Sequence, residues 1–375
     1  MTGSGRRLFT AIPDSGRWYM TNLHTSEMLD WLNERDPLKL TGLFRAARAC
    51  AVEHVGSKVY FRGLIESGNV CEKNCHYCGI RRGNRNFPRY SMTESEILAC
   101  AREAFEMNYG SVVLQAGERC GPGYSAFIEK IIRGIKTLSG GKIGITLSLG
   151  EQSLETYEAW FRAGAHRYLL RIETSNPTLY KNLHPSDHSF EKRLECLRAL
   201  KSTGYQTGTG VMIGLPGQTC EDLVNDILFF EREDMDMIGM GPYIPHEDAP
   251  LPSDGRDIGE NFRLGLVMIA LARLRLKNVN ITAATALQAL DPEGREKGVM
   301  AGANIIMPNL TPVKYREAYQ LYEGKPCLDE DAGESSGGRL DRRIRFAGAQ
   351  IGYGDWGDSP RFRSRNNGTA GPGKA

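Results

Sequence analysis

The sequence predicts an α/β fold in which parallel strands close into a complete (β/α)8 barrel. Eight apolar runs of strand length follow one another between residues 59 and 307. Helical patterns fill the intervals, so strand and helix alternate throughout this stretch. Repeated alternation of this kind is typical of a parallel sheet covered by helices, and eight repeats are enough to close a barrel. Two doubly wound domains are the alternative, but no linker separates two such halves in the sequence.

The predicted elements divide the chain into three parts. Residues 1–55 are an N-terminal extension that is helical over 25–55, residues 56–327 are the barrel, and residues 328–375 are a C-terminal tail. The tail is rich in Gly, Ser, Asp and Arg, so we expect it to be irregular, with its last fifteen residues disordered. The expected strands are 59–65, 111–116, 142–149, 166–172, 206–213, 236–240, 279–284 and 303–307.

Local signals mark the ends of several helices. Thr93 starts a capping box, and Ser189 and Thr219 are suitable N-caps, because their hydroxyl groups can accept a hydrogen bond from a free backbone N–H. Gly164 and Gly204 are suitable end points, because glycine readily adopts the left-handed conformation that terminates helices. Besides the helix after Thr93, the expected helices are 124–138, 153–163, 189–203, 219–233, 257–276 and 292–301.

Composition narrows the class of protein. The chain has 375 residues and a formal net charge of +2, so no strong field favours nucleic acid or an acidic membrane surface. No apolar run reaches transmembrane length, and no apolar segment follows the N-terminal arginines as in a signal peptide. The nine cysteines are odd in number. We therefore expect a cytoplasmic protein whose cysteines serve a metal site rather than disulfides.

Three of these cysteines, Cys71, Cys75 and Cys78, are clustered directly after the first predicted strand. The loops that follow barrel strands form the active-site face of this fold. Three thiolates can hold a metal centre but leave one of four coordination positions open, and an open position is where chemistry takes place. A zinc site completed by His76 is the alternative, but this histidine is too close in sequence to its neighbours to complete a tetrahedron easily.

Further polar residues lie at the ends of later strands. Arg171 and Glu173 are two apart on the fourth strand, so both point to one face, which is the interior mouth of a barrel. A solvated ion pair is the alternative interpretation. Arg193 follows on the next helix, and its fork of donors suits a carboxylate. Residues 208–217 are rich in glycine, which allows a ligand to approach the backbone closely.

The cysteine spacing, with aromatic Tyr77 before the last cysteine, resembles the signature of the radical S-adenosylmethionine (radical SAM) superfamily. The resemblance implies that the three thiolates bind three irons of a 4Fe–4S cluster and that S-adenosylmethionine chelates the fourth. Reductive cleavage of S-adenosylmethionine then gives a 5′-deoxyadenosyl radical. The cofactor contacts it implies are Tyr77, Gln115, Ala116, Gly117, Glu118, Glu173, Arg193, Met212 and Leu215. The superfamily more often has glycine where this chain has Ala116.

Six segments resemble one family in particular, the HydE-type maturases of FeFe hydrogenases. They are CGIRRGN (78–84), LRIETSNP (170–177), GLPGQT (214–219), GPYIPH (241–246), IMPNLTP (306–312) and YQLYEGK (319–325). The resemblance implies action on a small anionic substrate, a cysteinate-bound iron complex with CO and cyanide, during assembly of the hydrogenase active-site cluster. It also implies a flavodoxin or ferredoxin as electron donor, and a radical SAM lyase and a scaffold GTPase as partner maturases. The implied substrate pocket is Arg62, Thr146, Arg167, Arg171, Met237 and Tyr315.

This chain lacks two sets of cysteines that some relatives have, and two alternative functions remain open. Some family members carry a second cluster on cysteines after the barrel, but no cysteine follows Cys327, so we expect no second cluster. Biotin synthase needs another set of cysteines in the barrel, and no such set is visible. A carbon-skeleton mutase similar to methylornithine synthase remains an alternative, because it would also grip a carboxylate with arginines. A non-catalytic iron–sulfur redox sensor is the alternative from another class.

Overall fold

The computed structural model describes residues 23–251, 253–255, 257–326 and 334–367, and in these the predicted barrel is confirmed. Its eight strands are all parallel and follow the order β10-β1-β2-β3-β4-β5-β7-β9. The ring closes where the backbone N–H of Ala283 donates to the carbonyl of Ile305 at 2.9 Å. The barrel strands are β1 (Lys58–Gly68), β2 (Ser111–Ala116), β3 (Gly144–Ser148), β4 (Arg167–Leu169), β5 (Gln206–Thr209), β7 (Met237–Ile238), β9 (Asn280–Ile281) and β10 (Ile305–Ile306).

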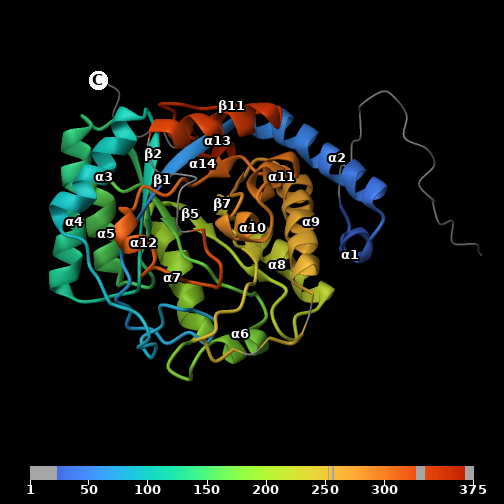
Figure 1. Ribbon diagram of the computed structural model, residues 1–375, viewed down its shortest axis with the longest axis horizontal. Coiled ribbons are helices and arrows are strands. Elements are labelled where there is room, and N and C mark those ends of the chain that lie inside the picture. The colour runs from blue at the N-terminus through green and yellow to red at the C-terminus, as the bar shows by residue number, and fades with distance from the viewer. Residues whose placement is uncertain (1–22, 252, 256, 327–333, 368–375) are drawn as a thin grey trace, which may run out of the picture.

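Helices surround this ring (Figure 1). Those of the outer layer are α3 (Glu94–Glu106), α4 (Pro122–Leu138), α5 (Leu154–Ala163), α7 (Phe190–Thr203), α8 (Cys220–Arg232), α9 (Ile258–Leu276) and α11 (Gly294–Met300). Short helices α6 (Pro177–Leu183), α10 (Thr285–Leu290) and α12 (Val313–Arg316), which the sequence did not predict, follow β4, β9 and β10. A second parallel pair, β6 (Met212–Ile213) with β8 (Gly241–Pro242), continues beyond β5 and β7.

The predicted helix ends are confirmed. The hydroxyl groups of Thr93, Ser189 and Thr219 each accept a hydrogen bond from a backbone N–H of the first turn of α3, α7 and α8. Gly164 and Gly204 end α5 and α7 with φ values of 117° and 106°. Residues with a side chain rarely adopt this left-handed region, so the two glycines fix where these helices turn back toward the next strand.

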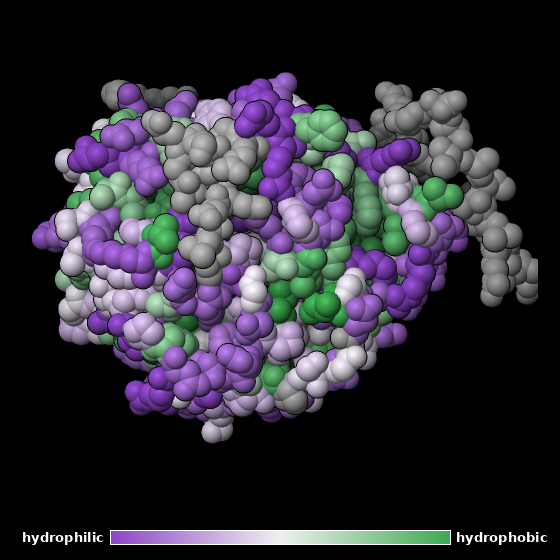
Figure 2. All heavy atoms as spheres, in the orientation of Figure 1, coloured by the Kyte–Doolittle hydropathy of each residue, from purple (hydrophilic) through white to green (hydrophobic). Residues whose placement is uncertain are grey.

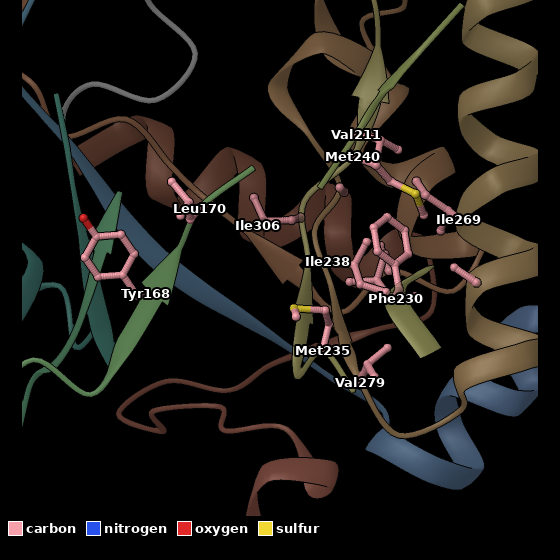
Figure 3. Packing of buried hydrophobic residues seen from close by; sticks show 14 of the residues in the cluster. Tyr168, Leu170, Val211, Phe230, Met235, Ile238, Met240, Ile269, Val279 and Ile306 are labelled. Atoms are coloured by element: carbon pink, nitrogen blue, oxygen red, sulfur yellow. The ribbon is translucent and has the colours of Figure 1, made fainter. Parts of the chain in front are cut away.

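Alternate strand residues face the helices and the lumen. A Cβ atom built on Gly63 would lie 3.4 Å from Cβ of Ala104 in α3, so Gly63 faces outward and its neighbours Arg62 and Leu64 face the lumen. The outward residues form the core. Figure 3 shows Met235, Ile238 and Met240 packed with Phe230 of α8 and Ile269 of α9. Burial of such side chains against helices is the main force that holds strands and helices together.

The N-terminal extension packs on the side of the barrel. Its helices α1 (Thr25–Asn33) and α2 (Pro37–Val55) confirm the expected helical segment within the described residues. Asp36 separates them and caps α2, because its carboxylate accepts from the backbone N–H of Leu38 at 2.9 Å. Helix α2 lies along α9.

The C-terminal tail differs from our expectation of an irregular segment. It contains α13 (Glu334–Phe346), β11 (Gln350–Ile351) and α14 (Pro360–Asn367), so residues 361–367 of the expected disordered end are helical. Cys327 and residues 328–333 and 368–375 lie outside the described residues. Strand β11 pairs with the start of β1, and α13 and α14 lie at the end of the barrel opposite α6 (Figure 1). The tail therefore covers the floor of the barrel, where the strands begin.

The tail folds through contacts that a local pattern does not reveal. Helix α14 has no apolar stripe; Arg365 instead pairs with Asp234 at 2.9 Å and with Asp236 at 2.6 Å.

Among the described residues, no helix is long and apolar enough to cross a membrane. The face of the molecule in Figure 2 is mostly hydrophilic, as expected for helices that bury only one side.

Candidate functional site

The loop after β1 carries the three clustered cysteines to the carboxyl end of the barrel. The side chain of Arg89 joins four points of this loop. Its guanidinium donates hydrogen bonds to the carbonyl oxygen atoms of Asn69, Ile80, Arg81 and Asn84 at 2.6, 2.7, 2.6 and 2.8 Å. A planar fork of five donors can satisfy four carbonyls at once, so Arg89 helps to fix a loop that has no regular secondary structure.

The thiols of Cys71, Cys75 and Cys78 lie near enough to influence one another electrostatically. Burial raises the pKa of all three thiols. The charge of Cys71 raises the pKa of Cys75 further, and the charges of Cys75 and Cys71 raise that of Cys78. Burial is the largest cause for Cys75, where it raises the pKa to about 12. His76 points elsewhere, since its Nδ1 lies 3.1 Å from the carbonyl oxygen of Asn182. No three His, Cys, Asp or Glu side chains of the described ranges are gathered as around a single metal ion.

The turn after β2 packs directly against the cysteine loop. A Cβ atom built on Gly117 would lie 2.4 Å from the carbonyl oxygen of Val70 and 2.8 Å from Cβ of Cys71, which is too close for any side chain. The N–H of Gly117 donates to the carbonyl of Gly68 at 2.9 Å. Glycine at this position therefore allows the loop and the turn to form one continuous wall. Ala116, beside it, is half-buried.

Buried and half-buried charges line the same wall. Lys73 of the cysteine loop lies 3.3 Å from the carboxylate of Glu118 and 3.1 Å from that of Glu151. Nε of Arg193 in α7 lies 2.6 Å from Oε1 of Glu151. Burial lowers the pKa of Lys73, but the two carboxylates outweigh burial and raise it above its usual value. Two cations and two carboxylates thus balance each other beside the cysteines.

The end of β4 carries the acidic residue that the sequence singled out. Glu173 has a φ of 66°, in the left-handed region that is costly for a residue with a side chain. Its Oε2 lies 3.1 Å from Nε of Arg171, and the hydroxyl of Tyr77 donates to its Oε1 at 3.4 Å. The strained backbone thus holds the carboxylate between the cysteine loop and the barrel mouth. Strain of this kind is concentrated at functional sites.

An apolar patch completes the mouth. Leu179, Leu183, Leu215 and Tyr243 are buried together there, and Tyr77, Met212 and Leu251 pack against them. Gln218 fixes the turn, because its Oε1 accepts from the backbone N–H groups of Gly214 and Leu215 at 2.7 and 3.1 Å. Gln115, on the lumen side of β2, donates to the hydroxyl of Tyr319 at 3.3 Å.

Most of the predicted pocket residues meet at the floor of the barrel. The guanidinium of Arg62 donates to Sδ of Met237 at 3.2 Å and to the carbonyl of Gly357 at 3.3 Å. Arg167 pairs with Asp358 at 2.7 Å, and Thr146 is its register partner on β3. Three buried atoms, Nε of Arg62, Nη1 of Arg167 and Oγ1 of Thr146, have no hydrogen-bond partner among the described residues. Burial lowers the pKa of both arginines.

The structure separates two predicted pocket residues from this floor group. Arg171 lies at the mouth with Glu173. Tyr315 stacks on Tyr90 with ring centroids 4.5 Å apart and donates to Oε1 of Glu96 at 2.8 Å. Its contacts are therefore with the first turn of α3 and with the segment before it.

Sequence reasoning missed several residues of this site. Glu151 lies two residues beyond the third predicted strand, and Lys73 lies between the first two cysteines, so their positions could have indicated a role. Arg89 and Asp358 gave no such signal. Arg89 binds backbone carbonyls of a loop, and Asp358 pairs with Arg167, which is 191 positions away in the sequence. No local sequence pattern reveals such contacts.

Comparison with known proteins gives the class and then the family. The model of the Radical SAM superfamily matches residues 65–230, which include the cysteine loop. The chain is 50% identical over 289 residues to the [FeFe] hydrogenase maturase subunit HydE of Thermotoga maritima, across 77% of this chain and 80% of that protein. It is 28% identical over 251 residues to biotin synthase of Crocosphaera subtropica, across 65% and 64% of the two chains.

Two solved structures share the fold. Methylornithine synthase (PylB) superposes with a TM-score of 0.75 at 23% identity, across 89% of this chain and 95% of that one. The FeFe-hydrogenase maturase HydG of Carboxydothermus hydrogenoformans superposes with a TM-score of 0.73 at 19% identity, across 88% and 76%. At these identities the likeness concerns the barrel alone.

The cysteine loop, the barrel and the superfamily match together define a radical SAM enzyme. Within this class the chain belongs to the HydE family of [FeFe] hydrogenase maturases. The predicted family and enzyme class are thereby confirmed. Membership implies a 4Fe–4S cluster and S-adenosylmethionine as cofactors, and a small-molecule substrate handled alongside other maturases.

Proposed function

We propose that this chain cleaves S-adenosylmethionine reductively and directs the resulting radical at a small anionic substrate. The proposed substrate is a cysteinate-bound iron complex with CO and cyanide, converted during assembly of the FeFe-hydrogenase active-site cluster. One observation carries the proposal. Three thiols lie at the mouth of a closed barrel, and its floor holds buried arginine nitrogen atoms that have no hydrogen-bond partner in the described part of the chain. The 50% identity to a HydE maturase supports it.

The proposed cluster ligands are Cys71, Cys75 and Cys78. Burial disfavours their free thiolates, and a bound metal centre would supply the positive charge that compensates them. Three cysteine ligands leave one iron for the amino and carboxylate groups of S-adenosylmethionine. When bound, cluster and cofactor together supply the 5′-deoxyadenosyl radical.

We propose that the chain binds one iron–sulfur cluster and no second one. The remaining described cysteines lie on separate elements: Cys50 on α2, Cys100 on α3, Cys120 in the loop after β2, Cys196 on α7 and Cys220 on α8. Such scattered positions do not provide a second set of ligands.

The mouth residues fit the parts of S-adenosylmethionine. The cofactor carries a carboxylate, an amino group and a purine. Arg193 can donate to the carboxylate, and Glu173, already oriented by Tyr77 and Arg171, can accept from a cationic or hydroxyl group. Backbone groups around Gly117 can meet the amino group. We propose that Met212 and Leu215 contact the apolar face of the purine. Gln115, Ala116 and Glu118 are proposed as further cofactor contacts, on the wall that the cysteine loop forms with the turn after β2.

The lumen suits an anion. Asp358 neutralises Arg167, but Arg62 has no carboxylate within salt-bridge distance among the described residues, and its Nε lacks a hydrogen-bond partner. A buried cation in this state is costly unless an anion joins it. We propose that substrate anions meet Arg62, Thr146, Arg167 and Met237, while Arg171 guides them at the mouth. The tail seals the floor and excludes water from that side. Tyr315 stays a prediction, since its contacts lie toward α3.

The first experiment separates an enzyme from a redox sensor. The protein is reconstituted anaerobically with iron and sulfide, then given dithionite and S-adenosylmethionine, and 5′-deoxyadenosine is measured. We expect nucleoside formation in the wild type and none in Cys75→Ala. A cluster that forms without any nucleoside above this control would support the sensor.

The second experiment addresses the substrate. The reconstituted enzyme is incubated with the cysteinate-bound iron complex and, separately, with lysine, which a methylornithine synthase rearranges. The proposal predicts loss of the complex and an unchanged lysine pool. Rearranged lysine with an intact complex would favour the mutase. Flavodoxin or ferredoxin is the proposed electron donor, and a radical SAM lyase and a scaffold GTPase are the proposed partners.

A further inference from the structure

The loop after β3 places a carboxylate against the arginine of the barrel mouth. Oε1 of Glu151 accepts from Nε of Arg193 at 2.6 Å, and Nη1 of Arg193 donates to the carbonyl oxygen of Arg171. The side chains of Glu151 and Arg193 are only 12% and 7% exposed. Nη2 of Arg193 makes no hydrogen bond to the described residues. The protein therefore holds two of the three guanidinium nitrogen atoms and leaves one open to a ligand.

The backbone on either side of this glutamate is fixed as well. Gly150 has a φ of 75°, and a Cβ atom built on it would lie 2.2 Å from Oε2 of Glu118, so glycine lets the loop approach that carboxylate. The side-chain amide of Gln152 donates to the carbonyl oxygen atoms of Arg119 and Leu149 at 2.9 and 3.0 Å. A carboxylate on a loop held in this way points in one direction.

A second cation fixes the plane of the Glu151 carboxylate. Its Oε2 lies 3.1 Å from Nζ of Lys73, in the loop of the clustered cysteines. Each oxygen atom of the carboxylate thus has its own cationic partner. Lys73 also pairs with Glu118 at 3.3 Å, so the charge of this lysine does not depend on Glu151 alone. Glu151 therefore connects the arginine of α7 to the cysteine loop.

We propose that Glu151 is a positioning residue that directs Nη2 of Arg193 at the carboxylate of S-adenosylmethionine. This inference rests on the proposed function, in which Arg193 donates to that carboxylate. An arginine side chain has many rotamers, and ordering them on binding costs conformational entropy. Because Glu151 holds Nε, the guanidinium is oriented before the cofactor arrives, and this cost does not reduce the affinity.

A simpler role for Glu151 would be to neutralise the charge of Arg193. Two conservative variants separate position from charge. Glu151→Gln keeps an oxygen acceptor at the same distance along the side chain but loses the charge. Glu151→Asp keeps the charge but is one methylene shorter, so its carboxylate withdraws from Nε. The positioning role predicts a defect in Glu151→Asp and none in Glu151→Gln, whereas neutralisation predicts the reverse.

The test measures binding without turnover. The cluster is reconstituted and kept oxidised, so that S-adenosylmethionine is not cleaved, and equilibrium dialysis gives its Kd. The second ligand is decarboxylated S-adenosylmethionine, which lacks the carboxylate but keeps the amino group, the sulfonium and the adenosine. The ratio of the two Kd values measures recognition of the carboxylate. A general loosening of the site would weaken both ligands alike and would leave this ratio unchanged.

We expect the wild type to prefer S-adenosylmethionine over the decarboxylated ligand. Glu151→Asp should reduce this preference about tenfold, as expected for the loss of one hydrogen bond to a charged group. The Kd of the decarboxylated ligand should stay at its wild-type value, and Glu151→Gln should keep the wild-type preference. The matched controls are Glu155→Asp and Glu155→Gln, at an exposed position of α5, which should leave both Kd values unchanged.

Two results overturn the inference. One is a wild-type preference in a cluster-bearing Glu151→Asp, and the other is a lost preference in a cluster-bearing Glu151→Gln. Each variant decides by itself, so the test stands if one of them does not retain its cluster. A wild-type protein that does not bind S-adenosylmethionine at its cluster defeats the proposed function itself, which is a different result from an unchanged preference in the variants.

Discussion

The guanidinium of Arg167 and the carboxylate of Asp358 join β4 to the C-terminal tail, with Nη2 2.7 Å from Oδ1. The arginine is fully buried. Burial alone would raise the pKa of Asp358, but the guanidinium outweighs burial and lowers the pKa below its usual value. The tail therefore supplies a negative charge to a floor that also contains Arg62, which has no carboxylate within salt-bridge distance among the described residues.

Replacing Asp358 should destabilise the protein strongly. Asp358→Asn leaves Arg167 buried without its counter-charge, which typically costs about 3 to 5 kcal/mol. The free energy of unfolding from urea titration of the apoprotein measures the loss. Asp355→Asn is the matched control: its partner Lys58 lies 2.6 Å away, but both side chains are about half exposed, so we expect a loss below about 1 kcal/mol. Equal losses would contradict a structural role for the floor ion pair.

Replacing Glu173 should abolish activity, but the effect on stability should depend on which residue replaces it. Glu173→Gly and Glu173→Ala both remove the carboxylate, so both should lose formation of 5′-deoxyadenosine. Because φ is 66° here, the glycine variant should unfold with a free energy about 1 to 2 kcal/mol higher than that of the alanine variant. The same pair at Glu155, in the first turn of α5, should show the reverse order, since alanine favours a helix. An alanine variant that is the more stable at residue 173 would rule out backbone strain.

The barrel was predictable because each of its signals is local. Apolar runs, capping hydroxyls such as Thr93 and helix-ending glycines such as Gly164 each act within a few residues, and the order of elements then determines a closed sheet. The tail was not predictable. Leu340 and Ile344 bury one side of α13, but α14 depends on Arg365 and distant aspartates. Ion pairs between residues far apart in the sequence produce no periodic sequence pattern.

The candidate site follows the same division. Cys71, Cys75 and Cys78 are close in sequence, so their cluster was visible at once. The ion pair of Arg193 with Glu151 depends on how two strand–helix units pack, so only the arginine drew attention. Tyr315 was assigned to the pocket by resemblance, and its position beside Tyr90 depends on the loop after β10.

A side chain at residue 117 should prevent assembly of the cluster. In Gly117→Ala the new Cβ would meet the carbonyl oxygen of Val70 at 2.4 Å and push the cysteine loop away from the wall. We expect iron and sulfide per chain after reconstitution to fall severalfold, while the circular dichroism of the barrel stays unchanged. Gly123→Ala is the control, because no atom lies within 4 Å of a Cβ built there. Full iron content in Gly117→Ala would show that the loop can yield.

Asp226 of α8 should make stability fall as the pH rises toward neutrality. Its Oδ1 accepts from the N–H of Ser175 at 2.6 Å, but Oδ2 has no partner among the described residues. Burial raises the pKa of Asp226 to about 7. Because this pKa exceeds that of an unfolded aspartate, about 3.9, the folded state binds more protons between pH about 4 and 7, and the free energy of unfolding decreases as protons leave.

Asp226→Asn removes this titration. We expect the variant to be more stable than the wild type at pH about 8, by at most about 4 kcal/mol, and the two to converge near pH about 4, where both side chains are neutral in the folded state. Urea titrations of the apoproteins across this range measure the difference. Asp30→Asn, at an exposed position of α1, should follow the wild-type curve. If the free energies of unfolding of Asp226→Asn and the wild type changed equally with pH, the buried carboxyl would not lose its proton in this range.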